Sequence, residues 1–314
     1  MREHQPLREI LERPRPFVAP DLRPTGLRLR PERLGDGVYA LLANQPPKDN
    51  NGVVFGRDAT LVVDTGVTPT VGEQIQHEAS KLTAAPIRYV ANTTYHGDHT
   101  FGNTAFGSEV TILSSTANRM CMDDLEREKR ARSESMFGES SLDEVTTWRR
   151  PDIAFDRFLS VDLGNKTVWL WHFGPGNGAG DVLVQAPEEE VAWTGNFLVP
   201  AGMVPMVLIG DPWSYSDSVR AALEQLDIER IVPGHGSIAP ARPAAEWMLD
   251  YLEQLGATVL RDFRAGKDVD RVMNEFTLSA GHGENEMVRA LNESFHRLNI
   301  LTTYRRLGDS AERD

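Results

Sequence analysis

The sequence predicts an α/β fold in which two β-sheets pack face to face and helices cover the outside. Short apolar, β-branched runs separated by Pro, Asn, Asp and Gly form one group between residues 37 and 113 and a second between 152 and 193. Helical patterns lie between and after the two groups. Two strand meanders with helices between them favour two packed sheets. With 314 residues and 40% apolar content, the chain can bury a substantial core.

Residues 1–30 are expected to form an N-terminal arm, followed by a single domain over 31–314 that includes the C-terminal helices. Arginines and prolines fill the arm and disfavour regular structure beyond a short helix near residues 7–11. The arm could cover a second subunit of a homo-oligomer, and a solvated tail is the alternative.

The first group predicts strands at 37–43, 52–55, 60–64, 87–91 and 110–113. Between them, residues 71–82 carry apolar side chains at helical spacing, with His77 off the buried stripe. Residues 118–132 alternate in charge and predict a solvated helix. The Ser-rich stretch 133–147 is either a mobile lid or a plain loop.

The second group predicts strands at 152–163, 167–173, 181–184 and 190–193. Ser214 or Ser216 can cap the next helix, and two longer helices follow Pro240. The glycine-rich stretch 174–180 loosely fits a dinucleotide fingerprint. Because a strand pattern follows it where that motif needs a helix, nucleotide binding is rejected.

Composition excludes several kinds of partner. The net charge is −13, with 33 basic and 46 acidic residues, which argues against nucleic acid. A single cysteine, Cys121, allows neither an internal disulfide nor a thiolate metal cluster. Neither a secretory signal nor an apolar run of membrane-spanning length is evident, so no membrane contact and a cytoplasmic location are expected.

Residues 92–103, Asn-Thr-Thr-Tyr-His-Gly-Asp-His-Thr-Phe-Gly-Asn, follow the apolar strand expected at 87–91. His96, Asp98 and His99 therefore belong to a loop leaving a strand end, where functional groups are commonly held. Imidazole and carboxylate ligands without thiolates suit a borderline divalent cation such as zinc. The alternative is a polar turn that carries two histidines and an aspartate without a metal.

The loop resembles the H-x-H-x-D-H signature of the metallo-β-lactamase-fold superfamily, with Thr94 at the first histidine position. Four further segments resemble superfamily motifs in the same order. These are Val62–Gly66 with Asp64, Gly174–Asp181 with Asn177 at a histidine position, Ala192–Asn196 with Asn196 in place of a bridging aspartate, and Ile231–Gly236 with His235. The resemblance implies an αββα four-layer sandwich.

Transferred by position, the resemblance implies one metal site. The first set, Thr94, His96 and Asn177, keeps a single imidazole, whereas the second set, Asp98, His99 and His235, survives whole. Asp64 would orient the ligand loop from behind. One divalent ion is expected, with zinc the first choice and iron(II) or manganese as alternatives, because two imidazoles and a carboxylate also suit iron(II).

A single metal implies Lewis-acid activation of a carbonyl, because the hydroxide shared by two metals is missing. The leading hypothesis is a cyclase or lyase step on a bulky, mostly apolar substrate, since the loop also resembles a polyketide-cyclase branch. A hydrolase of an ester, thioester or lactone and a non-catalytic binding protein are the alternatives.

Candidate site residues follow from these hypotheses. His96 could transfer protons, Tyr95 could contribute a hydroxyl or lie in the core, and Asn196 is the third candidate catalytic residue. The apolar stretch 199–209 either walls the pocket or is a buried crossover loop. The candidate substrate-binding residues are Thr94, Asn177, Trp193, Met203, Met206 and Trp213.

Overall fold

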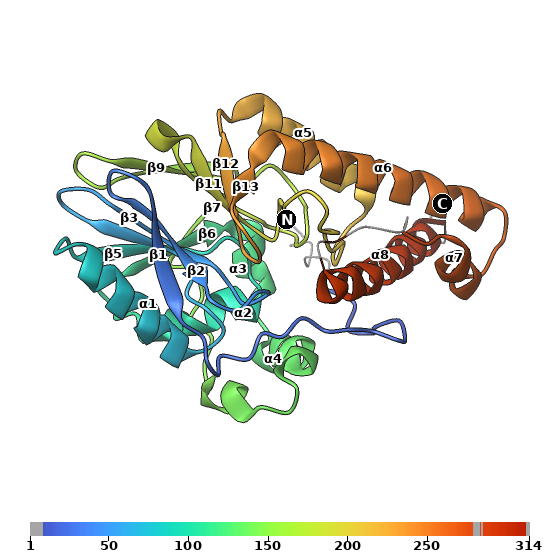
Figure 1. The fold of residues 1–314 in the computed structure, drawn as a ribbon, viewed down its shortest axis with the longest axis horizontal. Coiled ribbons are helices and arrows are strands. Elements are labelled where there is room, and N and C mark those ends of the chain that lie inside the picture. Colours follow the sequence, from blue (N-terminus) through green and yellow to red (C-terminus); the bar gives the residue numbers. More distant parts are fainter. Residues whose placement is uncertain (1–8, 279–282, 284, 312–314) are drawn as a thin grey trace, which may run out of the picture.

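Two β-sheets pack against each other and carry helices on their outer faces in this computed structural model, which describes residues 9–278, 283 and 285–311 (Figure 1). One sheet has the order β1 (Leu29–Gly35), β2 (Val38–Ala43), β3 (Asn51–Phe55), β4 (Thr60–Val63), β5 (Ile87–Ala91), β6 (Thr111–Ser115) and β7 (Ile153–Phe155). The other has the order β13 (Ala239–Pro240), β12 (Arg230–Pro233), β11 (Val191–Gly195), β10 (Leu183–Ala186), β9 (Thr167–Trp171) and β8 (Phe158–Asp162). The predicted αββα architecture is confirmed.

The helices are α1 (Pro69–Leu82), α2 (Gly97–Thr100), α3 (Thr116–Cys121), α4 (Leu125–Ser133), α5 (Pro212–Gln225), α6 (Ala241–Arg264), α7 (Val269–Glu275) and α8 (Glu286–Ala311). The Ser-rich stretch contains the 3-10 turns Glu134–Met136 and Ser140–Glu144. Helix α1 is capped at its N-terminus by Thr68, whose side chain accepts a hydrogen bond from Val71 N.

Three apolar layers hold the sandwich together. Alternate residues of both sheets, such as Val54 and Leu170, meet in the space between them. The opposite face of the first sheet packs on α1 through Val71 and Ile75. The opposite face of the second sheet packs on α5 and α6. Every residue of β4 and of β11 is buried, because both faces of these strands are covered. Burial on both faces explains why their sequences are largely continuous apolar runs.

Each sheet contains a parallel strand pair, and these pairs position the site. Strand β4 runs parallel to β5 in the first sheet, and β11 runs parallel to β12 in the second. The loops that leave the carboxyl ends of parallel strands are the usual place for ligands in open α/β sheets. Four of the five motifs identified in the sequence leave these strand ends, and the fifth, Gly174–Asp181, lies between the antiparallel strands β9 and β10.

The loop 199–209 is tied to α8 by two asparagines. Asn292 accepts a hydrogen bond from Val204 N (2.9 Å) and donates to Gly202 O (2.8 Å). Two helical turns later, Asn299 accepts from Val207 N (2.7 Å) and donates to Pro205 O (2.7 Å). The loop is therefore held through its main chain. Its prolines prevent regular structure, and the two asparagines supply the hydrogen-bond partners that its buried N–H and C=O groups would otherwise lack.

The structure corrects several sequence expectations. Strand β1, which extends the first meander at its edge, and helix α7 were not predicted, and β12 was identified only as part of the Ile231–Gly236 motif. Helix α5 is capped by Asp211, which accepts hydrogen bonds from Trp213 N and Ser214 N, and not by Ser214 or Ser216. The alternative that the arm is a solvated tail is wrong for residues 9–28, because Glu9 and Leu22 are buried against the rest of the protein. In the part of the chain that the structure describes, no helix is long and apolar enough to cross a bilayer.

Candidate metal centre

The site begins at the end of β4, where Asp64 anchors the ligand loop. Its backbone has a positive φ of 57°, a conformation that non-glycine residues adopt rarely and that often marks a position held by its surroundings. Its carboxylate accepts hydrogen bonds from Thr93 N (2.8 Å) and Thr93 Oγ1 (2.6 Å), and Oδ2 lies 2.9 Å from His99 Nδ1. Because Nδ1 of His99 is occupied in this way, Nε2 is the nitrogen left for a metal.

The ligand loop after β5 folds into the short helix α2. Asp98 and His99 are both buried, and Asp98 Oδ2 lies 3.7 Å from His99 Nε2. Thr100 fixes the turn by donating from its hydroxyl to His96 O (2.9 Å). Asn103 closes the loop by exchanging side-chain hydrogen bonds with Asn92. The Thr and Asn of this motif therefore serve the fold of the loop.

His235 reaches the same place from the end of β12. Its Nε2 lies 3.4 Å from Asp98 Oδ2, and its Nδ1 faces Pro47 O at 2.5 Å. The preceding Gly234 permits the close approach, since a Cβ there would lie 2.7 Å from His99 Cε1. The predicted trio of Asp98, His99 and His235 is thus brought together.

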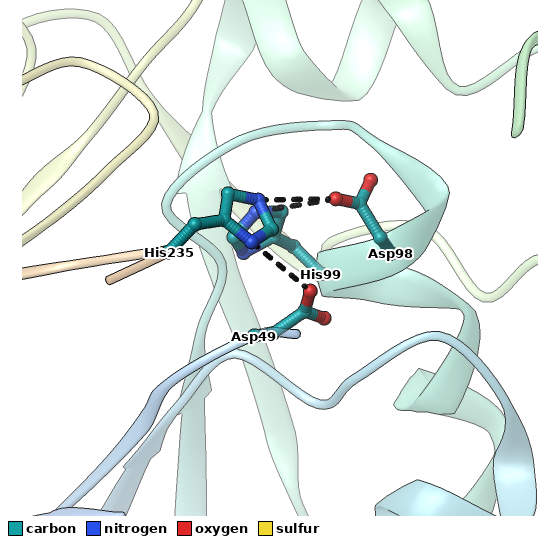
Figure 2. Close-up of side chains that lie close together, drawn as sticks. All are labelled: Asp49, Asp98, His99 and His235. Carbon is teal, nitrogen blue, oxygen red and sulfur yellow. Dashed lines mark ion pairs between the residues drawn. The ribbon is translucent and has the colours of Figure 1, made fainter. Parts of the chain in front are cut away.

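A fourth donor, Asp49, was not predicted. It lies in the loop between β2 and β3, where its neighbour Asn50 donates from Nδ2 to Pro233 O (3.0 Å) and Gly236 O (2.7 Å). These bonds fasten the loop to the His235 turn, and Asp49 Oδ1 lies 3.6 Å from His235 Nδ1. The four ligand atoms of Asp49, Asp98, His99 and His235 all lie within 4.8 Å of one another (Figure 2).

The electrostatics of the cluster fit a cation. Burial raises the pKa of Asp49 to about 7, with the neighbouring Asp98 contributing. Burial opposes the charge of His99, but Asp64 and Asp98 raise the pKa of its ring to about 10. Two carboxylates and two imidazoles enclosed together are a donor set that suits zinc, iron(II) or manganese. Their two negative charges would balance one dication.

The positions of the other metal site hold neutral groups. Thr94 is fully buried, and its hydroxyl faces Gly178, where a Cβ would lie 3.6 Å from Oγ1. Asn177 donates from Nδ2 to Met206 O (2.9 Å). The side-chain Nδ2 of Asn196 lies between His96 Nδ1 (3.2 Å) and His99 Nε2 (3.3 Å). Neither threonine nor carboxamide is a strong zinc ligand.

His96 and Tyr95 are less suited to the predicted catalytic roles than expected. Burial, and then the charge of Arg132, lowers the pKa of His96 to about 3, so the ring is neutral at pH 7 and a weak base. Tyr95 is buried in an apolar cluster with Met122, Leu208 and other side chains. Its hydroxyl therefore matches the core alternative.

The predicted substrate-binding residues divide into two groups. Met203 lies beside the His235 turn, since its sulfur would be 3.2 Å from a Cβ at Gly236, and the main chain of Met206 holds Asn177. Trp193, in contrast, is 2% exposed, packs between the sheets and donates to Asn51 O (3.1 Å). Trp213 packs on Gly256 of α6. The structure therefore contradicts a pocket role for Trp193 and places Trp213 at a helix contact.

Comparison with known proteins agrees with this architecture. Residues 48–235 match the metallo-β-lactamase superfamily. A metallo-β-lactamase from Erythrobacter litoralis shares 22% identity over 72% of this chain and 96% of its own, with a TM-score of 0.56. The mono-zinc form of the metallo-β-lactamase FIM-1 from Pseudomonas aeruginosa shares 19% identity over 72% of this chain and 95% of its own (TM-score 0.56). The inverting sec-alkylsulfatase Pisa1 from Pseudomonas sp. shares 14% identity over 91% of this chain and 52% of its own (TM-score 0.63).

Fold and site together define a protein of the αββα class with a candidate metal centre at the sheet edge. The family match spans more than half of the chain. The chain belongs to the metallo-β-lactamase superfamily.

Proposed function

We propose that this protein is a metal-dependent enzyme that holds one divalent cation between Asp98, His99 and His235, with Asp49 as a fourth donor. The observation that carries the proposal is the convergence of these four ligand atoms within 4.8 Å. The ligand positions of the other site, in contrast, are Thr94 and Asn177 together with the lone imidazole of His96. One cation is the occupancy that the donors support.

Zinc is the first choice for the ion, with iron(II) or manganese as alternatives, because imidazole and carboxylate ligands suit all three. When bound, such an ion acts as a Lewis acid that polarises a carbonyl or related oxygen. Asp64 and Pro47 O hold the Nδ1 atoms of His99 and His235, which fixes the orientation of both rings. Asn196 presents its carboxamide beside His99 and can hydrogen-bond an oxygen of the substrate.

The favoured reaction is a cyclisation or lyase step on the carbonyl of a bulky, apolar substrate of the kind found in polyketide metabolism. Two features support it. Asn196 cannot supply the bridging charge that paired metals share, and the side chain of Met203 lies beside the His235 turn. The low pKa of His96, about 3, also makes its neutral ring a weak base for activating water.

Hydrolysis of an ester, thioester or lactone is the second candidate. It is favoured by the similar solved structures, whose names are those of β-lactamases and a sulfatase, one of them in a mono-zinc form. A non-catalytic binding protein is the third candidate, and the four converging donors argue against it.

Elemental analysis of gently purified protein, followed by assay of the metal-loaded form, tests the proposal. We expect one metal per chain, little hydrolysis of model esters, thioesters and lactones, and carbon–carbon bond formation or cleavage with aromatic polyketone substrates. Rapid hydrolysis without carbon–carbon chemistry would favour the second candidate. A chain that binds no metal would favour the third.

Assembly through the N-terminal arm remains a separate proposal. Light scattering after size exclusion, with and without the arm, measures it. A cytoplasmic location likewise remains a prediction from the sequence.

A further inference from the structure

The N-terminal arm places a buried carboxylate close to the metal centre. Residues 9–28 run past α4 and reach α8 (Figure 1). Leu22 N donates to Ser135 O (3.1 Å) beyond α4, and Val18 N donates to Ser294 Oγ (2.8 Å) on α8. Glu9, at the start of the described chain, is only 4% exposed.

Glu9 is buried because it pairs with Arg132, near the C-terminal end of α4. Glu9 Oε2 lies 2.5 Å from Arg132 Nη2, and its other oxygen pairs with Arg13. Glu128, one turn before Arg132, lies 3.0 Å from the guanidinium Nε. A buried guanidinium is tolerated only when anions and hydrogen bonds replace its hydration. Glu9 and Glu128 supply those anions.

Glu128 and Arg132 of helix α4 contact two neighbouring residues of the ligand loop, Gly97 and Asp98. Glu128 Oε1 accepts a hydrogen bond from Gly97 N (2.8 Å). Arg132 Nη1 lies 3.8 Å from Oδ1 of the next residue, Asp98. The other oxygen of Asp98, Oδ2, faces His99 and His235. Arg132 therefore attracts one carboxylate oxygen and leaves the other directed at the metal donors.

We propose that Glu9 is a positioning residue of the metal centre: it holds Arg132 in place behind Asp98, so the N-terminal arm contributes to metal binding. Neutralising Glu9 would leave the guanidinium with less compensation inside the protein. Its attraction for Asp98 would then grow, and the site would gain positive charge that opposes a cation. The inference rests on the proposed metal site.

The test compares Glu9→Gln with Glu12→Gln. Both variants remove one negative charge from the arm, but Glu12 is 62% exposed and pairs with Arg305 on the surface. Dissociation constants for Zn²⁺ are measured by competition with a chromophoric chelator, and Co²⁺ absorption spectra report the ligand geometry. We expect Glu9→Gln to weaken Zn²⁺ binding about 10-fold or more, the range seen when partners behind metal ligands are removed, and to shift the Co²⁺ spectrum. Glu12→Gln should stay within about 2-fold of wild type.

A second variant, Arg132→Lys, keeps the buried positive charge while removing the guanidinium fork. We expect weaker Zn²⁺ binding here too, and a double variant no weaker than the worse single one, because both residues act through the same contact. If Glu9→Gln does not fold, as judged by circular dichroism, Arg132→Lys decides by the same criterion.

A folded Glu9→Gln that binds Zn²⁺ like wild type, with an unchanged Co²⁺ spectrum, overturns the inference and leaves the proposed function standing. Wild-type protein that binds no metal overturns both.

Discussion

Replacing Asp49 by asparagine tests whether the structure has revealed a true fourth donor. The substitution keeps the shape of the side chain and removes one of the two carboxylates among the four converging groups. Wild-type protein would balance a dication with Asp49 and Asp98, whereas the variant would leave one positive charge uncompensated in a buried site.

The size of the effect follows from the geometry. Two unit charges 4 Å apart interact by about 4 kcal/mol at an effective dielectric constant of about 20. With a pKa of about 7, Asp49 would lose its proton to solvent at little cost near neutral pH when a metal binds. The carboxamide still offers an oxygen, so we expect a loss of about 2–4 kcal/mol, which is roughly 30- to 1000-fold in affinity.

Isothermal titration with Zn²⁺ at pH 7.5 measures the affinity, and the Co²⁺ spectrum reports whether a protein ligand has been lost. Asp36→Asn is the matched control, because it removes the same charge from a turn where the side chain is 93% exposed. The reasoning is refuted if Asp49→Asn binds Zn²⁺ as tightly as the control while Asp98→Asn abolishes binding. A weaker affinity with an unchanged Co²⁺ spectrum would instead place Asp49 behind His235.

Three further outcomes are expected. The triple change Thr94→His, Asn177→His and Asn196→Asp should bind a second equivalent of Zn²⁺, measured by elemental analysis, because it restores imidazoles and the bridging carboxylate. Burial raises the pKa of Asp181 from 3.8 to about 6, so its folded form binds more protons and its charge costs about 3 kcal/mol at pH 7. Asp181→Asn should therefore stabilise the protein by up to that amount at pH 7.5, and the gain over wild type should vanish as the pH falls through 6 towards 4; thermal melts of both proteins test this. Asn299→Ala should lower the free energy of unfolding in urea by about 2–4 kcal/mol, because Val207 N and Pro205 O lose buried partners.

The fold and three donors could be predicted because their signals are local. Strand periodicity located most strands, and Asp98, His99 and His235 each follow a strand end within a recognisable motif. The ligand-loop motif is a weaker guide to the reaction than to the fold. Thr100 and Asn103, which contributed to the likeness to a cyclase branch, are occupied in closing their own loop.

Asp49 could not be found in this way, because nothing in its local spacing marks a ligand. Asn50 carries it to the site by bonding to Pro233 and Gly236, far along the chain. The pocket role expected for Trp193 has a related explanation. Trp193 is close to Asn196 in sequence, which suggested a pocket, but it lies in β11, every residue of which is buried.

The buried pair on α4 shows a second limit. Glu128 and Arg132 have the same four-residue spacing as Glu126 and Arg130, which the sequence equally assigns to a solvated helix. Only packing against the ligand loop and the arm decides which face is enclosed. Charge spacing alone does not report that choice.

The attachment of loop 199–209 to α8 does not depend on the side chains of Met203 and Met206, although Val204, Val207, Leu208 and Ile209 of the same loop are buried in the core. Asn292 and Asn299 grip amide and carbonyl groups that every residue type possesses, so exchanging Met203 or Met206 would not release the segment. Side chains beside the candidate metal centre can thus change while the main chain of the loop keeps its position.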